Sequence, residues 1–348
     1  SQRPKRGSMR QITIAKEEAG QRLDKLLGKI LNEAPSGFIY KMLRKKNIKV
    51  NQSRADGKEL LKEGDTVQIY LSDDTFAKFH KDKKTEFVGG EVSSKGTVLS
   101  ENRILYQDSD ILILNKPSGV LSQKAKASDD SINEQMIRYL LAAGKLTQEQ
   151  LITFTPSVCN RLDRNTSGIV LAGVSLAGSQ MLSSLLKERT VHKYYLALVQ
   201  GKVSKAGGGK AYLVKDSKTN QVRILQKPAE GAVMIETKYR PCNAGPDYSL
   251  LEVELITGKS HQIRAYLASL GHPIMGDAKY GDPGRNREFR NQYGIQNQCL
   301  HAYRIVFPVM DGHFHHLSEK TWMAPLPEKY RAVLEKLWGK ELTYGNLE

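Results

Sequence analysis

The sequence predicts an α+β fold that is divided between two domains. Its 348 residues are more than one ordinary domain needs, and the 39% of hydrophobic residues can supply a core for each domain. Segments with strand-like and helix-like patterns interleave irregularly, which favours α+β over a repeated strand–helix–strand unit. We see no internal repeat that would indicate a solenoid or a propeller.

The chain is expected to begin with a small folded unit over residues 10–72, after a cloning remnant at residues 1–9. Apolar residues recur at helical spacing between Arg22 and Leu31, and Ser36 is a plausible N-cap for a second helix that runs through Leu43. Short strands are expected at residues 48–51 and 66–71, separated by the turn residues Asp56-Gly57 and Gly64-Asp65.

The second helix of this unit and the residues just after it carry a run of cations with no acid among them: Lys41, Arg44, Lys45, Lys46 and Lys49. Together with Arg22-Leu23-Asp24 at the first helix and Gly64-Asp65 before the last strand, this arrangement resembles the S-four-type (alpha-L) RNA-binding domain. The resemblance implies that Arg22 and the five cations contact RNA. A solvated basic helix face is the alternative.

Residues 73–101 are polar and rich in Gly, Ser and Lys, and their composition predicts a flexible linker. The second domain is expected over residues 102–342. Its expected elements are strands at 111–114, 168–172, 195–199 and 251–255, a helix at 175–188, a hairpin turn at 310–313 and a closing amphipathic helix at 330–338.

Net charge gives the first indication of function. There are 53 Lys and Arg residues against 37 Asp and Glu residues, a formal charge of +16, and such an excess attracts polyanions. Charge alone does not separate DNA from RNA, and a basic enzyme without a nucleic-acid partner stays open. No run approaches the roughly 18 to 20 apolar residues of a membrane span, so no membrane partner is expected.

The three cysteines, Cys159, Cys242 and Cys299, are scattered and form no CxxC pair. This argues against a disulfide framework and a zinc finger, and a cytoplasmic monomer is expected. His313, His315 and His316 are the one histidine cluster, but no cysteine or carboxylate triad lies near them in the sequence, so no metal site is expected.

The segment Arg161-Leu162-Asp163-Arg164-Asn165-Thr166-Ser167-Gly168 is the strongest candidate for chemistry. It places a carboxylate in a polar loop ahead of an apolar strand, and the flanking arginines favour its ionised form. An ionised, positioned carboxylate suits covalent catalysis. On this local pattern alone, a helix cap, a turn residue or a surface ion pair is the more common use of such an aspartate.

This segment resembles the signature of the RluA-type (RluC/RluD-like) pseudouridine synthases, and further segments match in the family's order. These are Asn115-Lys116-Pro117-Ser118-Gly119, Lys193-Tyr194-Tyr195-Leu196-Ala197, Thr257-Gly258-Lys259-Ser260-His261-Gln262-Ile263-Arg264, Gly271-His272-Pro273-Ile274, Gly276-Asp277, Leu300-His301-Ala302 and Ala324-Pro325-Leu326-Pro327. The match covers roughly residues 104–330. It implies the family's catalytic domain, with a central mixed, mainly antiparallel sheet flanked by helices.

The resemblance implies that the chain isomerises uridine to pseudouridine on a flipped-out base in structured RNA, without cofactor or metal. Asp163 would be the catalytic carboxylate; whether it attacks the ribose, attacks the ring or acts as a base stays open. Arg264, in a short helix expected from an N-cap at Ser260, would pair with Asp163, and Tyr195 would stack on the target base. Because strand residues alternate between faces, the register decides between Tyr195 and Tyr194.

Four further positions are expected to contact RNA: Arg161, Arg164, Lys259 and His261. Asn160 and Lys259 depart from the family's usual His and Arg, which puts contacts inferred from those two positions in doubt. Lys259 would neutralise a phosphate without the bidentate fork of an arginine.

Large-subunit ribosomal RNA is the expected substrate, and transfer RNA is an alternative. A second alternative is a ribosome-assembly or RNA-binding protein that keeps the fold without turnover. A glycoside hydrolase would need a second catalytic carboxylate, and Asp277, the nearest candidate, looks like a turn residue.

Overall fold

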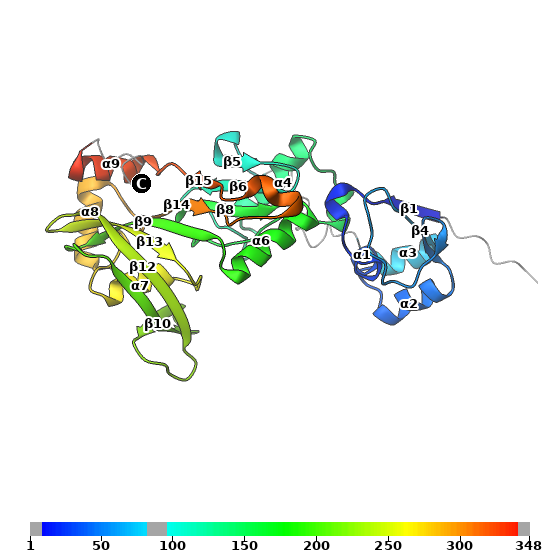
Figure 1. Ribbon diagram of the computed structural model, residues 1–348, viewed down its shortest axis with the longest axis horizontal. Coiled ribbons are helices and arrows are strands. Elements are labelled where there is room, and N and C mark those ends of the chain that lie inside the picture. The colour runs from blue at the N-terminus through cyan, green and yellow to red at the C-terminus, as the bar shows by residue number, and fades with distance from the viewer. Residues whose placement is uncertain (1–8, 82–95, 340–348) are drawn as a thin grey trace, which may run out of the picture.

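The computed structural model describes residues 9–81 and 96–339, which form two units with separate hydrophobic cores (Figure 1). The smaller unit is the N-terminal one, and the larger unit contains the rest of the described chain. Within these two ranges, none of the helices combines the length and the hydropathy that a bilayer crossing requires. Most of the expected cloning remnant lies outside the described residues, but Met9 does not, because it begins the first strand and pairs with Tyr70.

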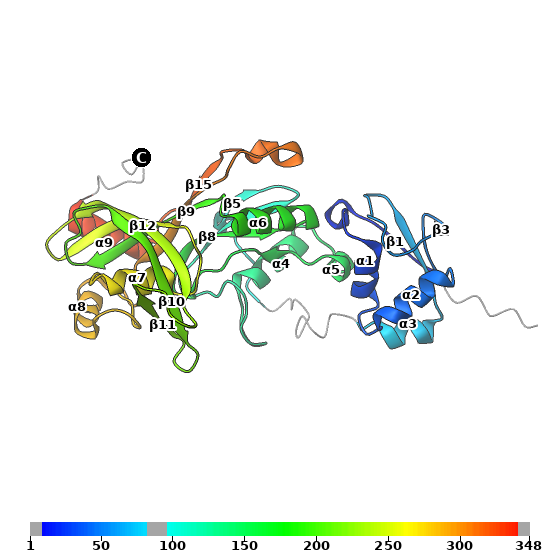
Figure 2. The same cartoon turned by 60° about the horizontal axis from the view of Figure 1, so that its bottom comes forward.

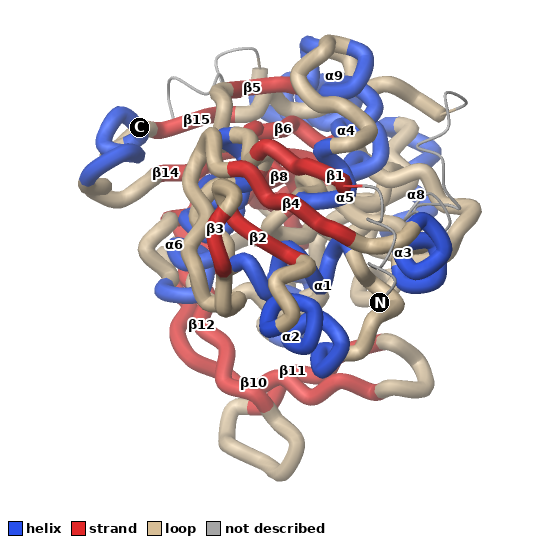
Figure 3. Tube along the Cα trace, turned by 90° about the vertical axis from the view of Figure 1, so that its right-hand side faces the viewer, coloured by secondary structure: helices blue, strands red, loops and turns tan. Residues whose placement is uncertain are grey.

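The smaller unit is an antiparallel sheet of strand order β1–β4–β2–β3 packed against three helices, and Figure 3 shows this sheet facing the viewer. Its elements are β1 (Met9–Thr13), α1 (Leu23–Ile30), α2 (Ser36–Arg44), β2 (Ile48–Val50), β3 (Ser53–Arg54), β4 (Thr66–Tyr70) and α3 (Asp73–Phe79). The two predicted helices and the two predicted strands are confirmed. The N-cap of α2 is Pro35 rather than Ser36, because proline's restricted φ of −64° suits the extended conformation of a cap.

The prediction of a linker that begins at residue 73 was wrong for its first residues. Asp73–Phe79 form α3, and the side chain of Ser72 accepts a hydrogen bond from the backbone N–H of Thr75 as its N-cap. Phe76 and Phe79 pack against the core of the smaller unit, so this helix belongs to that unit. The polar composition of the segment favoured a linker, although Phe76 and Phe79 stand at helical spacing within it. Residues 82–95 of the expected linker lie outside the described residues.

The larger unit is built on an eleven-stranded sheet whose main path runs β11–β10–β12–β13–β9–β14–β8–β6–β5. Strand β15 pairs with β14 and β7 pairs with β8, and the single parallel pair is β14 with β8. The predicted mixed, mainly antiparallel sheet is therefore confirmed. The strands are β5 (Ile104–Gln107), β6 (Ile111–Lys116), β7 (Ser157–Val158), β8 (Ser167–Gly173), β9 (His192–Gln200), β10 (Gly207–Asp216), β11 (Gln221–Leu225), β12 (Val233–Ala244), β13 (Tyr248–Leu255), β14 (Leu300–Val306) and β15 (Thr321–Met323).

Helices cover both faces of this sheet (Figure 2). They are α4 (Ile132–Ala142), α5 (Gln150–Thr153), α6 (Leu176–Glu188), α7 (Gln262–Ser269), α8 (Pro283–Tyr293) and α9 (Glu328–Trp338). In β8, Val170 belongs to the same apolar cluster as α4, whereas Leu171 belongs to the cluster that contains Leu182 of α6. Burial on both faces explains why β6 and β8 are continuous apolar runs rather than alternating ones.

The predicted hairpin at residues 310–313 is present, but its connection is longer than a tight turn. Strands β14 and β15 do pair as an antiparallel hairpin, but a 3-10 helix, η4 (Gly312–Leu317), lies in the connection between them. It forms because Leu317 is buried in the core beside α6, with Phe314 packed against it. Two of its histidines face carboxylates: His313 lies 2.8 Å from Asp110 and His316 lies 3.2 Å from Asp108.

The smaller unit contacts the larger one near α5, where the Nζ of Lys29 donates to the carbonyl of Thr153 at 3.3 Å. Lys16 also reaches the hydroxyl of Ser109 at 3.4 Å. Figure 2 shows α1 of the smaller unit lying next to α5 of the larger one.

Candidate active site and its relatives

The Asp163 loop lies between β7 and β8 and is held by backbone contacts to the segment that follows β6. Ser122 fixes Leu162, because its hydroxyl donates to the Leu162 carbonyl and accepts from the Leu162 N–H, at 3.0 and 2.9 Å. The N–H of Thr166 donates to the carbonyl of Asp163 at 3.0 Å and closes the turn. The loop is therefore anchored independently of the carboxylate, which stays free to act.

Lys116, at the end of β6, is completely buried beneath this loop. Its Nζ donates to the carbonyls of Pro117, Val120 and Arg164 at 2.9, 2.5 and 2.9 Å. Burial lowers the pKa of Lys116 to about 7, while three carbonyl acceptors call for the three N–H donors that only the ammonium form supplies. Lys116 therefore ties the residue next to Asp163 to the entry turn. In the sequence, Lys116 is part of the Asn115-Lys116-Pro117-Ser118-Gly119 motif, which by itself indicates no role for the lysine.

Gly168 lets the loop pass directly into β8. Its φ is +120°, and a Cβ at this position would lie 2.2 Å from the backbone oxygen of Ala302 on the neighbouring strand. Only glycine fits both the backbone angle and the close approach.

Arg264, in α7, connects Asp163 to a second carboxylate. Its Nη1 donates to Oδ2 of Asp163 at 2.8 Å, while Nε and Nη2 donate to the two oxygens of Asp277 at 2.7 and 3.0 Å. Burial by itself lowers the pKa of Arg264, but the hydrogen bonds and charges of Asp277 and Asp163 raise it overall. The predicted contact of Arg264 with Asp163 is present, and it is a charge-assisted hydrogen bond.

Asp277 was underestimated from the sequence, where it looked like a turn residue. It does shape a turn, because it accepts the N–H groups of Lys279 and Tyr280, yet it is completely buried and holds Arg264 through two hydrogen bonds. The signal that could have identified it is its place in the same motif block as Arg264.

The helix that carries Arg264 begins later than expected. The N-cap of α7 is His261, which has a left-handed conformation with φ of +60° and makes no side-chain cap, so the prediction of Ser260 as N-cap was wrong. The side chain of Gln262 instead holds the segment that precedes the helix, because its Oε1 accepts from the N–H of Lys259 at 3.1 Å and from the hydroxyl of Thr257 at 2.9 Å.

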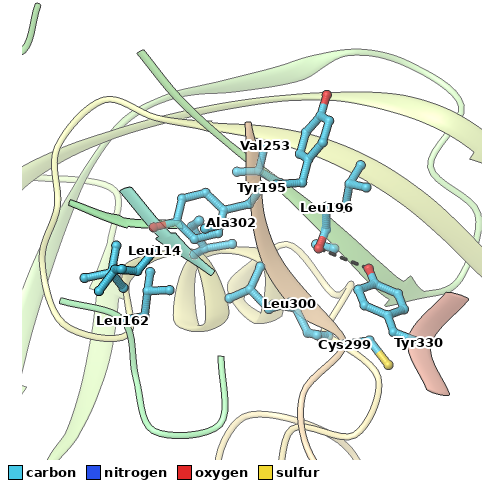
Figure 4. Close-up of a cluster of buried hydrophobic side chains, with 14 of the residues drawn as sticks. Leu114, Leu162, Tyr195, Leu196, Val253, Cys299, Leu300, Ala302 and Tyr330 are labelled. Carbon is cyan, nitrogen blue, oxygen red and sulfur yellow. Dashed lines mark hydrogen bonds between the residues drawn. The ribbon is translucent and has the colours of Figure 1, made fainter. Parts of the chain in front are cut away.

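Tyr195, rather than Tyr194, faces the site. It is 5% exposed and belongs to an apolar cluster that includes Leu162 and Leu300 (Figure 4). Burial, and then the charge of Asp163, raise the pKa of Tyr195. Tyr194 lies on the opposite face of β9, where the guanidinium carbon of Arg304 lies 4.1 Å from its ring centre. The register therefore supports the choice of Tyr195.

A cavity of about 1130 Å³ opens in front of Asp163, and Tyr195, His261 and Arg264 line it. Its wall contains nine cations: Lys124, Arg161, Arg164, Arg189, Lys193, Lys215, Lys259, Arg264 and Lys279. Among the described residues that line it, Asp163 is the one carboxylate. A single carboxylate among so many cations suits a polyanionic substrate and lacks the second acid that glycoside hydrolysis needs.

The other predicted RNA-contacting residues divide between this cavity and the smaller unit. Arg161 donates to Oε1 of Gln123 at 3.0 Å, and Arg164 and Lys259 are exposed at the cavity. Asn160 supports β8, because its Oδ1 accepts the N–H of Leu171 at 2.7 Å. In the smaller unit, Arg22 pairs with Asp24 at 2.8 Å, whereas Lys41, Arg44, Lys45 and Lys46 are exposed and Lys49 is half-buried.

In the described part of the chain, no group of three or more His, Cys, Asp or Glu residues has a geometry that could hold a metal ion. Of the predicted histidine cluster, His315 bonds the carbonyl of Met310 at 3.1 Å, and His313 and His316 face aspartates.

Comparisons with known proteins agree with this geometry. The family model described as "RNA pseudouridylate synthase" matches residues 110–269. The "Ribosomal large subunit pseudouridine synthase C" of Haemophilus influenzae is 31% identical over 95% of both chains, and the protein of the same name from Vibrio cholerae is 31% identical over 94% of this chain and 96% of its own. The solved structure titled "Human RNA Pseudouridylate Synthase Domain Containing 4" has a TM-score of 0.54 and 21% identity over 67% of this chain and 92% of its own, which supports the fold.

The two relatives match nearly the whole chain, and the family model includes the segments that hold Asp163, Tyr195 and Arg264. They confirm the resemblance inferred from the motifs and the prediction of an isomerase. The chain belongs to the RNA pseudouridylate synthase family.

Proposed function

We propose that this chain converts uridines of large-subunit ribosomal RNA to pseudouridine, with Asp163 as the catalytic carboxylate. The observation that carries the proposal is the hydrogen bond of Asp163 to Arg264, at 2.8 Å, inside a cavity lined by cations. The names of the H. influenzae and V. cholerae relatives support the choice of ribosomal RNA.

The reaction breaks the bond between ribose C1′ and uracil N1, turns the uracil, and forms a bond between C1′ and C5. The proton at C5 leaves and N1 gains one, so the product is an isomer and no redox partner is consumed. Every route requires a positioned carboxylate beside the nucleotide, and the hydrogen bond from Arg264 fixes the direction of the Asp163 side chain.

Tyr195 supplies an aromatic surface beside Asp163 against which a flipped uracil can stack. Stacking of a base on an aromatic ring contributes about 1 to 3 kcal/mol, which helps to offset the cost of removing the base from its helix. Arg161, Arg164 and Lys259, around the cavity, are suited to the phosphates on either side of the target.

The smaller unit supplies a second RNA contact under this proposal. The exposed cations of α2 and the turn after it form what we call the α2 basic surface: Lys41, Arg44, Lys45 and Lys46. Among the described residues, no carboxylate forms an ion pair with any of these four side chains, so they are available to phosphates. The fold of this unit, two short helices against a small sheet, supports the S-four-type interpretation.

The deciding experiment compares wild type with Asp163→Asn on transcripts of large-subunit ribosomal RNA and of transfer RNA. Tritium released from C5 of labelled uridine reports the isomerisation. We expect wild type to release tritium from the ribosomal transcript and Asp163→Asn to release none while binding the same RNA. Asp311→Asn, at an exposed aspartate outside the cavity, is the matched control and should behave as wild type.

Equal tritium release by wild type and Asp163→Asn would overturn the catalytic role of Asp163. RNA binding without release by the wild type would favour the non-catalytic alternative. Release from transfer RNA alone would overturn the ribosomal substrate.

A further inference from the structure

A row of three hydrogen-bonding groups, from Val222, Tyr280 and His261, leads to Asp163. The backbone N–H of Val222, in β11, donates to the hydroxyl oxygen of Tyr280 at 3.0 Å. That hydroxyl lies 2.7 Å from Nδ1 of His261, and the other ring nitrogen, Nε2, lies 4.0 Å from Oδ2 of Asp163. These contacts therefore connect the edge of the sheet to the cavity through Tyr280 and His261.

The position of one proton follows from these contacts. The Tyr280 oxygen already accepts from Val222, so its own proton needs an acceptor, and among the described contacts Nδ1 of His261 is the acceptor within reach. If Nδ1 carried a proton instead, the half-buried hydroxyl proton of Tyr280 would have no described acceptor. Nδ1 is therefore the acceptor, and in the neutral ring the proton lies on Nε2, which faces the cavity.

The surroundings of His261 favour the neutral ring. Burial lowers the pKa of His261, and Arg264 and Lys279 act in the same direction, against the opposing charges of Asp163 and Asp277. At 4.0 Å, the Nε2–H is too far from Asp163 for a direct hydrogen bond, so it is available to a group that binds in the cavity beside both side chains.

We propose that Tyr280 is a positioning residue that holds His261 as the neutral tautomer protonated on Nε2, and that this N–H donates to an oxygen of the target nucleotide beside Asp163. The consequence for the nucleotide rests on the proposed function; the tautomer does not. Arg264 already compensates the charge of Asp163, and a second cation would make the carboxylate a weaker nucleophile or base. A neutral donor orients the nucleotide without that cost.

The tautomer is tested directly by nitrogen NMR of the full chain labelled with ¹⁵N-histidine. His261→Gln identifies the His261 signals by their loss among those of the 8 histidines. We expect wild-type His261 to show an unprotonated Nδ1 and a protonated Nε2, and Tyr280→Phe to show a mixture of tautomers. A protonated Nδ1 in wild type, or an unchanged pattern in Tyr280→Phe, would overturn the proposal even if the enzyme is fully active.

Kinetics test the consequence. Tyr280→Phe should lower kcat about five- to tenfold, as expected when one oriented hydrogen bond is lost. Because the Tyr280 hydroxyl opposes protonation of Nδ1, its removal raises the pKa of His261, and the deficit should grow as the pH falls from about 8 to about 6. Tyr293→Phe is the matched control, because Tyr293 does not line the cavity and its hydroxyl makes no hydrogen bond to the described residues.

A double-mutant cycle separates positioning from a general structural effect. In His261→Gln, the side-chain amide can still offer an N–H near the position of Nε2 but has no tautomer to hold. We expect Tyr280→Phe to have no further effect on kcat in that background. If Tyr280→Phe lowers kcat equally in both backgrounds, Tyr280 does not act through His261. Thermal melting of each variant establishes that the folded chain is being compared.

Discussion

Asp277 accepts two hydrogen bonds from Arg264, at 2.7 and 3.0 Å, and both side chains are buried. The remaining nitrogen of the guanidinium, Nη1, donates a hydrogen bond to Asp163. Asp277 therefore fixes the plane in which Arg264 contacts the catalytic carboxylate. An arginine can serve two carboxylates in this way because its donors are arranged as a rigid planar fork.

Replacing Asp277 with Asn should therefore damage both stability and turnover. The substitution leaves a buried guanidinium with one carboxylate, and breaking a buried pair in this way costs about 3 to 5 kcal/mol. We expect a drop of this size in the free energy of unfolding, measured by urea titration, and a fall in kcat of at least about tenfold because Arg264 is misaligned. Asp282→Asn, at the exposed N-cap of α8, is the control and should change the free energy of unfolding and kcat little. Wild-type values of both quantities for Asp277→Asn would contradict the role of Asp277 in aligning Arg264.

Lys116→Met should destabilise the Asp163 loop. Methionine matches the length of the lysine but leaves the carbonyls of Pro117 and Val120 without their donor, while the carbonyl of Arg164 keeps the N–H of Gly119 at 2.8 Å. Unsatisfied buried groups cost about 1 to 3 kcal/mol each, so we expect two such carbonyls to lower the free energy of unfolding by roughly 2 kcal/mol or more. Lys238→Met, at an exposed lysine on β12, is the control. A fully stable Lys116→Met would show that the three contacts contribute little.

His301 should make the fold sensitive to acid. It is completely buried in β14, where its ring nitrogens bond the Ser167 hydroxyl at 2.7 Å and the Ala324 carbonyl at 2.9 Å, and burial lowers its pKa to about 4. In the unfolded chain, the His301 ring is protonated as the pH falls below its ordinary pKa of 6.5. In the folded chain, it is protonated only near pH 4. Stability is full above about pH 6.5 and falls as the pH drops towards 4, by about 3 kcal/mol in all.

Urea titrations of wild type and His301→Leu across this pH range measure the effect. The variant is expected to be less stable at neutral pH, because Ser167 and Ala324 lose a partner, but to lose less stability on acidification. His315→Gln, at an exposed histidine, should keep the wild-type pH dependence. Parallel curves for wild type and His301→Leu would assign the acid sensitivity to other groups.

The α2 basic surface should contribute to the salt dependence of RNA binding. Each phosphate contact that is lost reduces the slope of log affinity against log salt by about 0.7 to 0.9. We therefore expect the triple variant Lys41→Gln, Arg44→Gln, Lys45→Gln to lower the slope by about 2 to 3 while kcat at saturating RNA is kept. Filter binding over a salt series measures it.

The charge-matched control replaces three exposed cations elsewhere, Lys320, Lys329 and Arg331, with Gln. It removes the same net charge from a part of the surface that does not line the cavity. Equal slopes for the two triple variants would show that net charge, and not the α2 basic surface, is responsible.

Most of the elements could be predicted because local patterns determine them. The apolar spacing of α1 and α6 and the continuous apolar runs of β6 and β8 are properties of short segments. The failures occurred where a contact distant in the chain overrode composition: α3 forms because its aromatic residues reach the core of the smaller unit, and η4 forms because Leu317 reaches the core beside α6.

The sequence by itself determined the family and the identity of the candidate carboxylate, since ordered motifs around Asp163 are visible without coordinates. Only the tertiary structure decided which groups meet it. Asp277, which looked like a turn residue, is the buried partner of Arg264, and Tyr280 lies against His261. These relationships depend on how α7 and the turn after it pack against the Asp163 loop. Arg264 and Asp163 are separated by 101 positions in the chain, and no local pattern records their contact.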